Sequence, residues 1–149
     1  MGIREMNNQT QKLQEDDIPF LLARRTTELD GQIPSHLRFA LNDLSLVVDS
    51  PLKAVNVIGR KLNDTDSQVD IDLSVFDAYK FGISRQHAMI ICDVKNKRIQ
   101  IKDLNSTNGT FINDRTLRPL DPYTIRHGDI IRFAHLELLV HFLQVEVNR

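Results

Sequence analysis

Arg60 is the first side chain whose type and place suggest chemistry. It follows Gly59 after the apolar pair Val57-Ile58, where a strand is expected to run out into a polar loop. A guanidinium in such a place can form a two-pronged, charge-assisted hydrogen bond to a phosphate dianion. The alternative is a solvated surface arginine, and the choice depends on which other groups come near it.

A second candidate group stands where the loop of residues 77–83 opens into an apolar strand. The Ser84 hydroxyl and the neighbouring backbone N–H groups can donate to phosphate oxygens, and Arg85 adds a second positive charge. Serine is also common in turns for purely conformational reasons. His87 alternates with Arg85 along the strand and is expected to point toward the loop base. We therefore interpret it as a buried imidazole that braces the loops, and not as a ligand or a base.

The third candidate is the tight turn Ser106-Thr107-Asn108-Gly109, whose Asn-Gly pair permits positive φ angles. An asparagine amide carries a donor and an acceptor, so it can pair with an extended backbone. The simpler alternative is a hairpin turn without a binding role. Both can hold, because the turn is what projects the side chain. Three loops would then converge on one polar surface of a rigid scaffold, as in many binding sites.

An enzymatic function is not expected from these residues. Ser84, His87 and Asp103 can be named as a triad, but the chain has no Gly-x-Ser-x-Gly elbow, and the Ser and His stand three apart on an extended segment. A Gly-rich nucleotide loop is also absent. Metal-ligand spacing is missing from the later histidines, His127, His135 and His141. Recognition by hydrogen bonds needs no cofactor, metal or nucleophile.

Composition excludes several classes of protein. The 149 residues carry 19 Lys plus Arg and 20 Asp plus Glu, a net charge of −1, which argues against a broad nucleic-acid binder. Cys92 stands alone, so no internal disulfide or Cys-based zinc site can form. No apolar run approaches the ~18 residues of a membrane span, and residues 1–14 lack the apolar core of a secretion signal. A cytoplasmic protein is expected.

From residue 36 onward the sequence predicts a mostly β domain. Apolar and β-branched runs recur between Asp, Asn, Gly and Pro. Residues 69–73 and 99–102 alternate strictly between apolar and polar, as half-buried strands do. Residues 89–92 and 138–140 are apolar throughout, as in the central strands of a two-sheet sandwich. The expected strands cover residues 37–41, 44–48, 55–58, 69–73, 87–92, 98–102, 110–112, 130–133 and 136–147.

Residues 1–35 are expected to form a separate N-terminal extension. Residues 1–17 are rich in Asn, Gln, Asp and Glu and predict a disordered tail. Asp16-Asp17-Ile18-Pro19 then resembles a helix start that leads into residues 20–25, and Gly31 and Pro34 end this short helix. The compact domain is expected over residues 36–149.

Taken in order, four elements resemble the forkhead-associated (FHA) domain family: Gly59-Arg60, Ser84-Arg85-Gln86-His87, Ser106-Thr107-Asn108-Gly109 and His127-Gly128-Asp129. Each alone would be unspecific, whereas the ordered set on an all-β background is specific. The resemblance covers about residues 37–143 and is closest in kind to a single-domain, bacterial-type FHA protein. It implies an all-β fold, a two-sheet antiparallel β-sandwich of about eleven strands, that binds phosphothreonine peptides through loops at one end.

The resemblance also implies roles for individual residues. Phosphopeptide contacts are expected from Arg60, Ser84, Arg85, Thr107 and Asn108, with Thr107 at the phosphothreonine and Asn108 at the peptide main chain. Support of the site is expected from Gly59, His87 and Gly109. These expectations agree with the residue chemistry above.

Two departures from the family pattern bear on specificity. Asn113-Asp114 stands where the family often has Asn-Gly, and Asp enters the left-handed region less readily, so a different loop is expected. Residues 61–68 contain two acidic side chains, Asp64 and Asp66, which disfavours peptides with acidic flanks on that side. The choice of residue three positions after the phosphothreonine stays open. Candidate contacts for an acidic residue there are Lys80, Arg115 and Arg118.

The sequence thus predicts a phosphothreonine-peptide-binding module in Ser/Thr kinase-dependent signalling or assembly, with a kinase or its substrate as partner. The alternative is a scaffold that mediates protein contacts without phosphate dependence. The extension suggests self-regulation, since Thr26 and Thr27 follow two arginines and Asp30 stands three positions after Thr27. A phosphorylated Thr27 would then occupy the site of its own domain; the alternative is an ordinary helix end.

Overall fold

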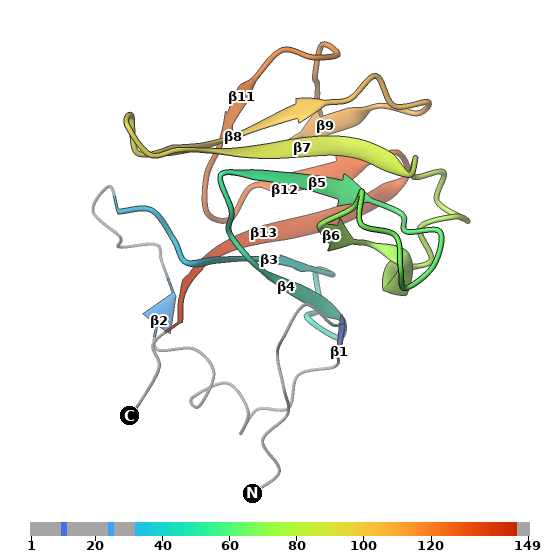
Figure 1. The fold of residues 1–149 in the computed structure, drawn as a ribbon, viewed down its shortest axis with the longest axis horizontal. Coiled ribbons are helices and arrows are strands. Elements are labelled where there is room, and N and C mark those ends of the chain that lie inside the picture. The colour runs from blue at the N-terminus through green and yellow to red at the C-terminus, as the bar shows by residue number, and fades with distance from the viewer. Residues whose placement is uncertain (1–9, 12–23, 26–31, 146–149) are drawn as a thin grey trace, which may run out of the picture.

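The computed structural model describes residues 10–11, 24–25 and 32–145, which form two packed β-sheets (Figure 1). One sheet has the order β1 (Thr10–Gln11), β4 (Val47–Pro51), β3 (His36–Ala40), β13 (Leu136–Gln144), β12 (Ile130–Phe133), β9 (Thr110–Ile112) and β10 (Arg115–Thr116), and β2 (Arg24–Arg25) pairs with β13. The other has the order β11 (Tyr123–Ile125), β8 (Arg98–Asp103), β7 (Gln86–Asp93), β5 (Val55–Gly59) and β6 (Ile71–Asp72). The predicted β-sandwich is confirmed, with β3 to β13 as its eleven strands among the described residues.

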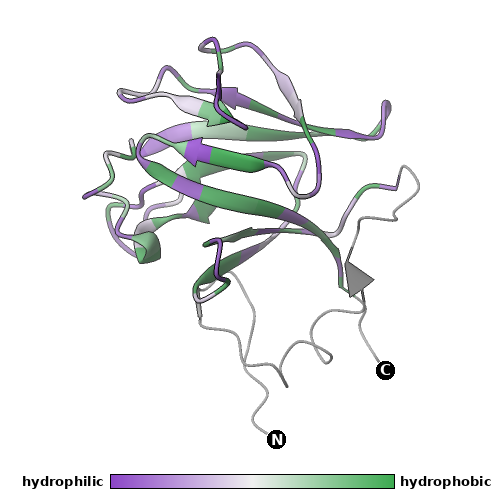
Figure 2. Ribbon diagram, turned by 180° about the vertical axis from the view of Figure 1, so that it is seen from behind, coloured by the Kyte–Doolittle hydropathy of each residue, from purple (hydrophilic) through white to green (hydrophobic). Residues whose placement is uncertain are grey.

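Alternating hydrophobicity places the core between the sheets. In β8, Ile99 and Ile101 are buried, whereas the alternating residues Gln100 and Lys102 are half-exposed. β7 lies at the centre of its sheet, as its continuous apolar sequence predicts, with Ala88 and Ile90 fully buried. The strands of both sheets are largely hydrophobic and the connecting loops largely hydrophilic (Figure 2). Period-two patterning is thus sufficient to orient these strands.

One buried ion pair lies within the first sheet. Arg38 and Asp49 face each other across β3 and β4, and both are nearly inaccessible, at 5% and 3% exposure. The guanidinium donates from Nε and Nη2 to the two carboxylate oxygens at 2.6 and 2.7 Å. Because each charge is fully paired, the two charged side chains are tolerated at buried positions.

Several sequence predictions need correction. Leu44 takes a φ of 61° in a turn, so the strand expected from residue 44 begins only at Val47. Residues 69–73 keep their alternating burial, but only Ile71–Asp72 form a strand before the 3-10 helix η3 (Ser74–Phe76). The short strands β10 and β11 carry no alternating pattern and were not predicted. β5 and β6 pair in parallel, in contrast to the antiparallel pairs around them.

The hairpin between β9 and β10 forms although Asp114 stands where a glycine is common in the family. Asn113 and Asp114 take φ angles of 46° and 68°, the left-handed values that a two-residue hairpin turn needs. Asn113 Oδ1 accepts a hydrogen bond from the Ile130 N–H at 2.9 Å, and its Nδ2 donates to Asp129 at 3.1 Å. These bonds hold the turn, and Asp114 takes the left-handed conformation there although aspartate enters it less readily than glycine.

The N-terminal extension touches the sandwich in two places. β1 pairs with Val47 and Val48 of β4, and β2 pairs with Leu143 and Gln144 of β13. Arg24–Arg25 is therefore a strand, and the helix predicted through residue 25 is wrong there; residues 16–23 and the tail at 1–9 lie outside the described residues. In the part of the chain that the structure describes, no helix has the length and apolar character of a membrane span.

Candidate functional site

Three loops leave the second sheet at the same end. Gly59, the last residue of β5, pairs with Gln86, the first residue of β7. Asp103, the last residue of β8, pairs with Ala88, near the start of β7. The loops after β5, before β7 and after β8 therefore emerge side by side, on the right of Figure 1. The strand ends thus bring together the three segments on which the sequence placed its candidate residues.

Gly59 allows two of these loops to touch. The pairing of β5 with β7 shifts register between Ile58 and Gly59, and the Arg60 N–H donates to the Arg85 carbonyl at 3.0 Å. A Cβ atom on Gly59 would lie only 1.9 Å from that carbonyl oxygen. The close approach leaves no room for any side chain, which is the physical reason for a glycine before the arginine.

The Arg60 side chain is oriented by a hydrogen bond at Nε, while its two Nη groups have no hydrogen bond to the described residues. Its Nε donates to the Ile83 carbonyl at 3.2 Å, and its guanidinium lies 5.1 Å from the centre of the Tyr79 ring. Neither Nη group has a hydrogen-bond partner among residues 32–145. The half-buried side chain is thus oriented while its two outer nitrogens stay available for a bidentate acceptor.

Ser84 connects the loop before β7 to the turn after β8. Its Oγ accepts a hydrogen bond from the Thr107 N–H at 3.2 Å. Because that bond uses a lone pair, the hydroxyl hydrogen remains free to donate to a ligand. Ile83, which binds Arg60, immediately precedes Ser84, so the structure brings Arg60, Ser84 and Thr107 together.

Asn108 points back to the loop before β7. Its Nδ2 donates to the Gly82 carbonyl at 2.9 Å, and Gly82 has a φ of +80° that favours glycine. Asn108 Oδ1 accepts no hydrogen bond from any described residue. The exposed amide therefore ties two loops together with one end and offers an acceptor with the other.

His87 is fully buried below the three loops. Its Nδ1 accepts a hydrogen bond from the Ser84 N–H at 3.0 Å, so the ring proton resides on Nε2, which bonds to the Gly109 carbonyl at 2.9 Å. Burial lowers the pKa of His87 below its ordinary value, and the Gly109 bond and the Asp103 charge offset this only in part. With Nδ1 occupied by a main-chain N–H, the imidazole cannot take the Ser84 hydroxyl proton.

Asp103 organises the turn after β8, a role that the sequence analysis missed. Its side chain is buried and accepts hydrogen bonds from the Ser106 hydroxyl, from the Ser106 N–H at 3.1 Å and from the Thr110 hydroxyl at 2.7 Å. Ser106 Oγ in turn accepts from the Gly109 N–H at 3.0 Å. The sequence does contain a signal for this role: Asp103 stands at a strand end, three residues before Ser106. Aspartate in such a place commonly accepts hydrogen bonds from the turn that follows it.

Among the described residues, the side chains of the remaining candidate cations make no hydrogen bond to Arg60, Ser84, Thr107 or Asn108. Arg85 is exposed, and its side chain faces the loop that follows Lys61. Lys80 is an exposed residue of the loop before β7. Arg115 belongs to β10, at the end of β9 opposite to the Asn108 turn, and lies over Tyr123 at 5.4 Å. Arg118 lies between β10 and β11, where its N–H donates to the Tyr123 hydroxyl.

We predict that Gly59→Ala destabilises the protein by about 1–3 kcal/mol, because the new Cβ forces β5 and β7 apart. Urea unfolding measures the loss, and hydrogen exchange at the Arg60 amide reports the broken bond to Arg85. Gly128→Ala is the matched control, since Gly128 has a φ of +89° but nothing within 4 Å of an added Cβ. The interpretation fails if both variants leave the Arg60 amide equally protected.

We also predict that the free energy of unfolding falls as the pH is lowered below about 6.5. The His87 ring takes up a proton there in the unfolded chain but stays neutral in the folded one until its lowered pKa is reached. Above about 6.5 both states are neutral and this contribution is constant. Burial lowers the pKa of His36 as well, so urea titrations of His36→Gln serve as the control. A pH slope that vanishes in His36→Gln would contradict the prediction.

The comparisons with known sequences agree with the resemblance to the FHA domain. A model of the FHA domain matches residues 56–134. Vacuolar protein sorting-associated protein 64 of Saccharomyces cerevisiae is 31% identical over 100 residues, which cover 62% of this chain and 16% of that protein. FhaA of Mycobacterium tuberculosis is 39% identical over 59 residues, 40% of this chain and 10% of that protein. The chain thus matches only a small part of these relatives, which include both a yeast and a bacterial protein.

Solved structures show the same fold. The FHA domain of FhaA, complexed with the intracellular domain of Rv3910, has a TM-score of 0.52 and 30% identity, covering 70% of this chain and 98% of that one. A structure from a study of phosphothreonine-dependent FHA domain interactions has a TM-score of 0.51 and 28% identity, covering 76% and 99%. With a family match over more than half of its residues, the chain belongs to the FHA-domain family.

Proposed function

We propose that this protein binds phosphothreonine-containing segments of a partner, a Ser/Thr kinase or its substrate, and that it does so in the cytoplasm and without catalysing a reaction. FHA domains are phosphopeptide-binding modules. The proposal assigns phosphate contacts to Arg60, Ser84, Arg85 and Thr107, and a main-chain contact to Asn108.

One observation carries the proposal. The Arg60 guanidinium is held near Ser84, because Arg60 Nε donates at 3.2 Å to the carbonyl of Ile83, the residue before Ser84. The Ser84 hydroxyl oxygen in turn accepts a hydrogen bond from the Thr107 N–H at 3.2 Å. Both groups keep unused donors on the same surface. Charge, hydroxyl donor and loop backbone are the chemistry that a phosphate dianion requires.

The expected strength is enough for selectivity. Each charge-assisted hydrogen bond contributes about 1.5–3 kcal/mol. Two such bonds, one from Arg60 and one from Ser84, would favour a phosphorylated peptide over its unmodified form by roughly 10²- to 10⁴-fold. Because Arg60 is already oriented by Ile83 and Tyr79, little side-chain entropy is lost when it binds.

The test is a calorimetric titration of a phosphothreonine peptide library pool and its unphosphorylated counterpart. We predict that Arg60→Ala weakens binding of the phosphorylated peptides by at least tenfold, because one charge-assisted bond is lost. Arg98→Ala is the matched control: Arg98 is an exposed arginine at the opposite end of β8, paired with Asp93. Equal affinity for both peptide forms, or equal effects of the two variants, would favour a scaffold without phosphate dependence.

Self-regulation by the N-terminal extension is a further part of the proposal. Thr26 and Thr27 lie outside the described residues, but β2 just before them pairs with Leu143 and Gln144, at the end of β13 remote from the phosphate loops. About 23 Å of strand separate Leu143 from Leu136. The nine residues from Thr27 to His36 span at most about 30 Å. A phosphorylated Thr27 can therefore reach its own site only if β2 leaves β13 and the segment is nearly extended.

We predict that phosphorylation of Thr27 shifts the NMR resonances of Arg60 and Ser84 in the same molecule and lowers affinity for added phosphothreonine peptide. Effective concentrations in the millimolar range make even weak intramolecular binding detectable. A Thr27→Ala chain treated with the same kinase is the control. Shifts that appear only at high protein concentration would mean that one copy binds another, and the absence of any shift would remove self-regulation.

A further inference from the structure

A cavity lies beside the three loops that carry Arg60, Ser84 and Asn108. It has a volume of about 330 Å³ and lies between residues 62–69 and the start of β7, with Asp66, Arg85 and Gln86 among its walls. It lies next to Arg60, since the carbonyl of Arg85, one of its lining residues, accepts the Arg60 N–H at 3.0 Å. A segment bound at Arg60 would pass its neighbouring side chains close to this cavity.

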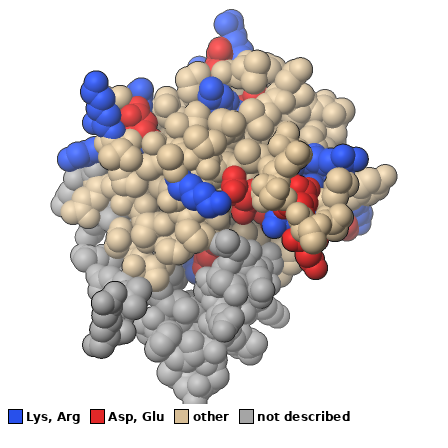
Figure 3. All heavy atoms as spheres, viewed as in Figure 1, with Lys and Arg blue, Asp and Glu red and all other residues tan. Residues whose placement is uncertain are grey.

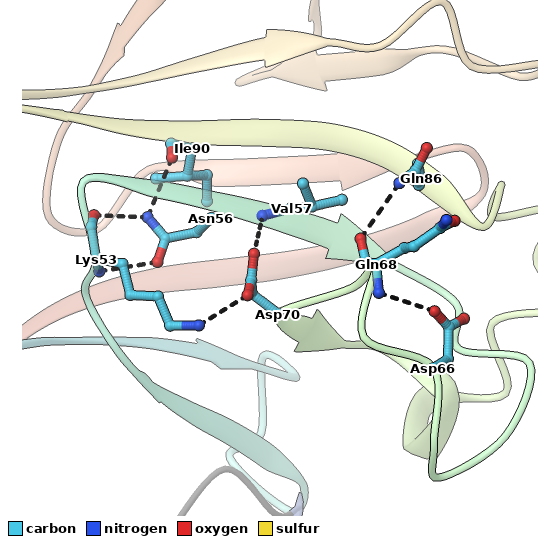
Figure 4. A network of polar contacts seen from close by, with 8 residues as sticks. All are labelled: Lys53, Asn56, Val57, Asp66, Gln68, Asp70, Gln86 and Ile90. Atoms are coloured by element: carbon cyan, nitrogen blue, oxygen red, sulfur yellow. Dashed lines mark hydrogen bonds and ion pairs between the residues drawn. The ribbon is translucent and has the colours of Figure 1, made fainter.

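The walls of the cavity are fixed by hydrogen bonds (Figure 4). Gln86 Nε2 donates to the Gln68 carbonyl at 3.3 Å, and the Gln68 N–H donates to Asp66 Oδ1 at 2.9 Å. The loop is anchored beyond this point by Asp70, which accepts from the Val57 N–H and from Lys53 Nζ, both at 2.8 Å. The cavity is therefore preformed and does not need a ligand to shape it.

Asp66 is a charged group with spare capacity. Its Oδ2 accepts the Leu62 N–H at 3.0 Å, so each carboxylate oxygen holds one backbone bond and retains a further lone pair. These two backbone bonds lower the pKa of Asp66 below its ordinary value, and the carboxylate is ionised near neutral pH. The side chain is only partly buried, which leaves it accessible to an incoming cation.

Arg85 faces the same cavity with the opposite charge. No ion pair within 4 Å joins it to Asp66 among residues 32–145, and the two charges attract each other through space. Acidic and basic side chains adjoin one another on this side of the molecule, at the right of Figure 3. A phosphate dianion at Arg60 would draw the flexible Arg85 toward itself and leave the charge of Asp66 uncompensated.

We propose that this cavity receives a basic side chain, arginine or lysine, of the bound phosphothreonine segment, with Asp66 as the residue that selects it. Arg85, which is attracted to Asp66 without an ion pair, then turns toward the phosphate as the ligand binds, and the basic side chain of the ligand pairs with Asp66. The inference rests on the proposed phosphothreonine binding and adds the chemistry of the residues that flank it. It extends the expectation that this side of the site disfavours acidic flanks.

The test compares phosphothreonine peptides that carry either arginine or its neutral isostere citrulline, one flanking position at a time. We expect the wild type to prefer arginine at one position by about fivefold, the upper range for an exposed ion pair. Asp66→Asn should abolish this preference, because it removes the charge; it also removes one of the two backbone hydrogen bonds that the carboxylate accepts. Asp64→Asn is the matched control, since Asp64 is exposed on the same loop and outside the cavity.

A second ligand separates a loss of charge from a loss of loop structure. Asp66→Asn should bind N-acetyl phosphothreonine amide more tightly than the wild type does, because Arg85 is no longer attracted away from the phosphate. A collapsed loop would weaken both ligands and overturn this account of Asp66. Binding of phosphothreonine peptides without any arginine preference overturns the inference and leaves the proposed function intact, whereas no phosphothreonine binding at all overturns both.

Discussion

The site depends on one buried imidazole. His87 has no contact with solvent, yet its two nitrogens bind main-chain groups of two different loops, the Ser84 N–H and the Gly109 carbonyl. The bonds require the neutral ring with its proton on Nε2, and the apolar surroundings, including Phe133 at 5.8 Å edge-to-face, favour that uncharged form. If the ring were absent, both loops would lose a shared anchor, and Ser84 would no longer be held beside Thr107.

Buried and exposed polar groups have separate tasks around this anchor. Asp103 and His87 are inaccessible, and the described hydrogen bonds satisfy them within the protein. Arg60, Ser84 and Asn108 each use one group to bind the scaffold and keep another for a ligand. These side chains are thus oriented before a ligand binds, so the entropic cost of ordering the site on binding is smaller. The proposed recognition of a single phosphate therefore needs only local donors and no excess of positive charge over the whole protein.

Much of the fold and of the site could be predicted from the sequence. The alternation of Ile99 and Ile101 and the continuous apolar run of β7 predicted strands with the right faces. Side-chain chemistry together with the resemblance to the FHA family selected Arg60 and Ser84, which the structure brings together. The short strands β10 and β11 were not predicted, because two or three residues are too few to show an alternating pattern. Arg24–Arg25 was assigned to a helix from a local start signal, whereas its strand pairing comes from a partner more than a hundred residues away.

The sequence by itself therefore determined the strand pattern, the all-β class and the residue types able to hold a phosphate, since these depend on neighbours within a few positions. Only the tertiary structure decided which groups are free. Asp103, which the sequence offered only as the third member of a rejected triad, holds a turn; Asn108, expected as a ligand contact, also binds Gly82. The carbonyl of Arg85 explains why Gly59 must be a glycine. Such roles arise from atoms distant in sequence, and packing alone sets their distances.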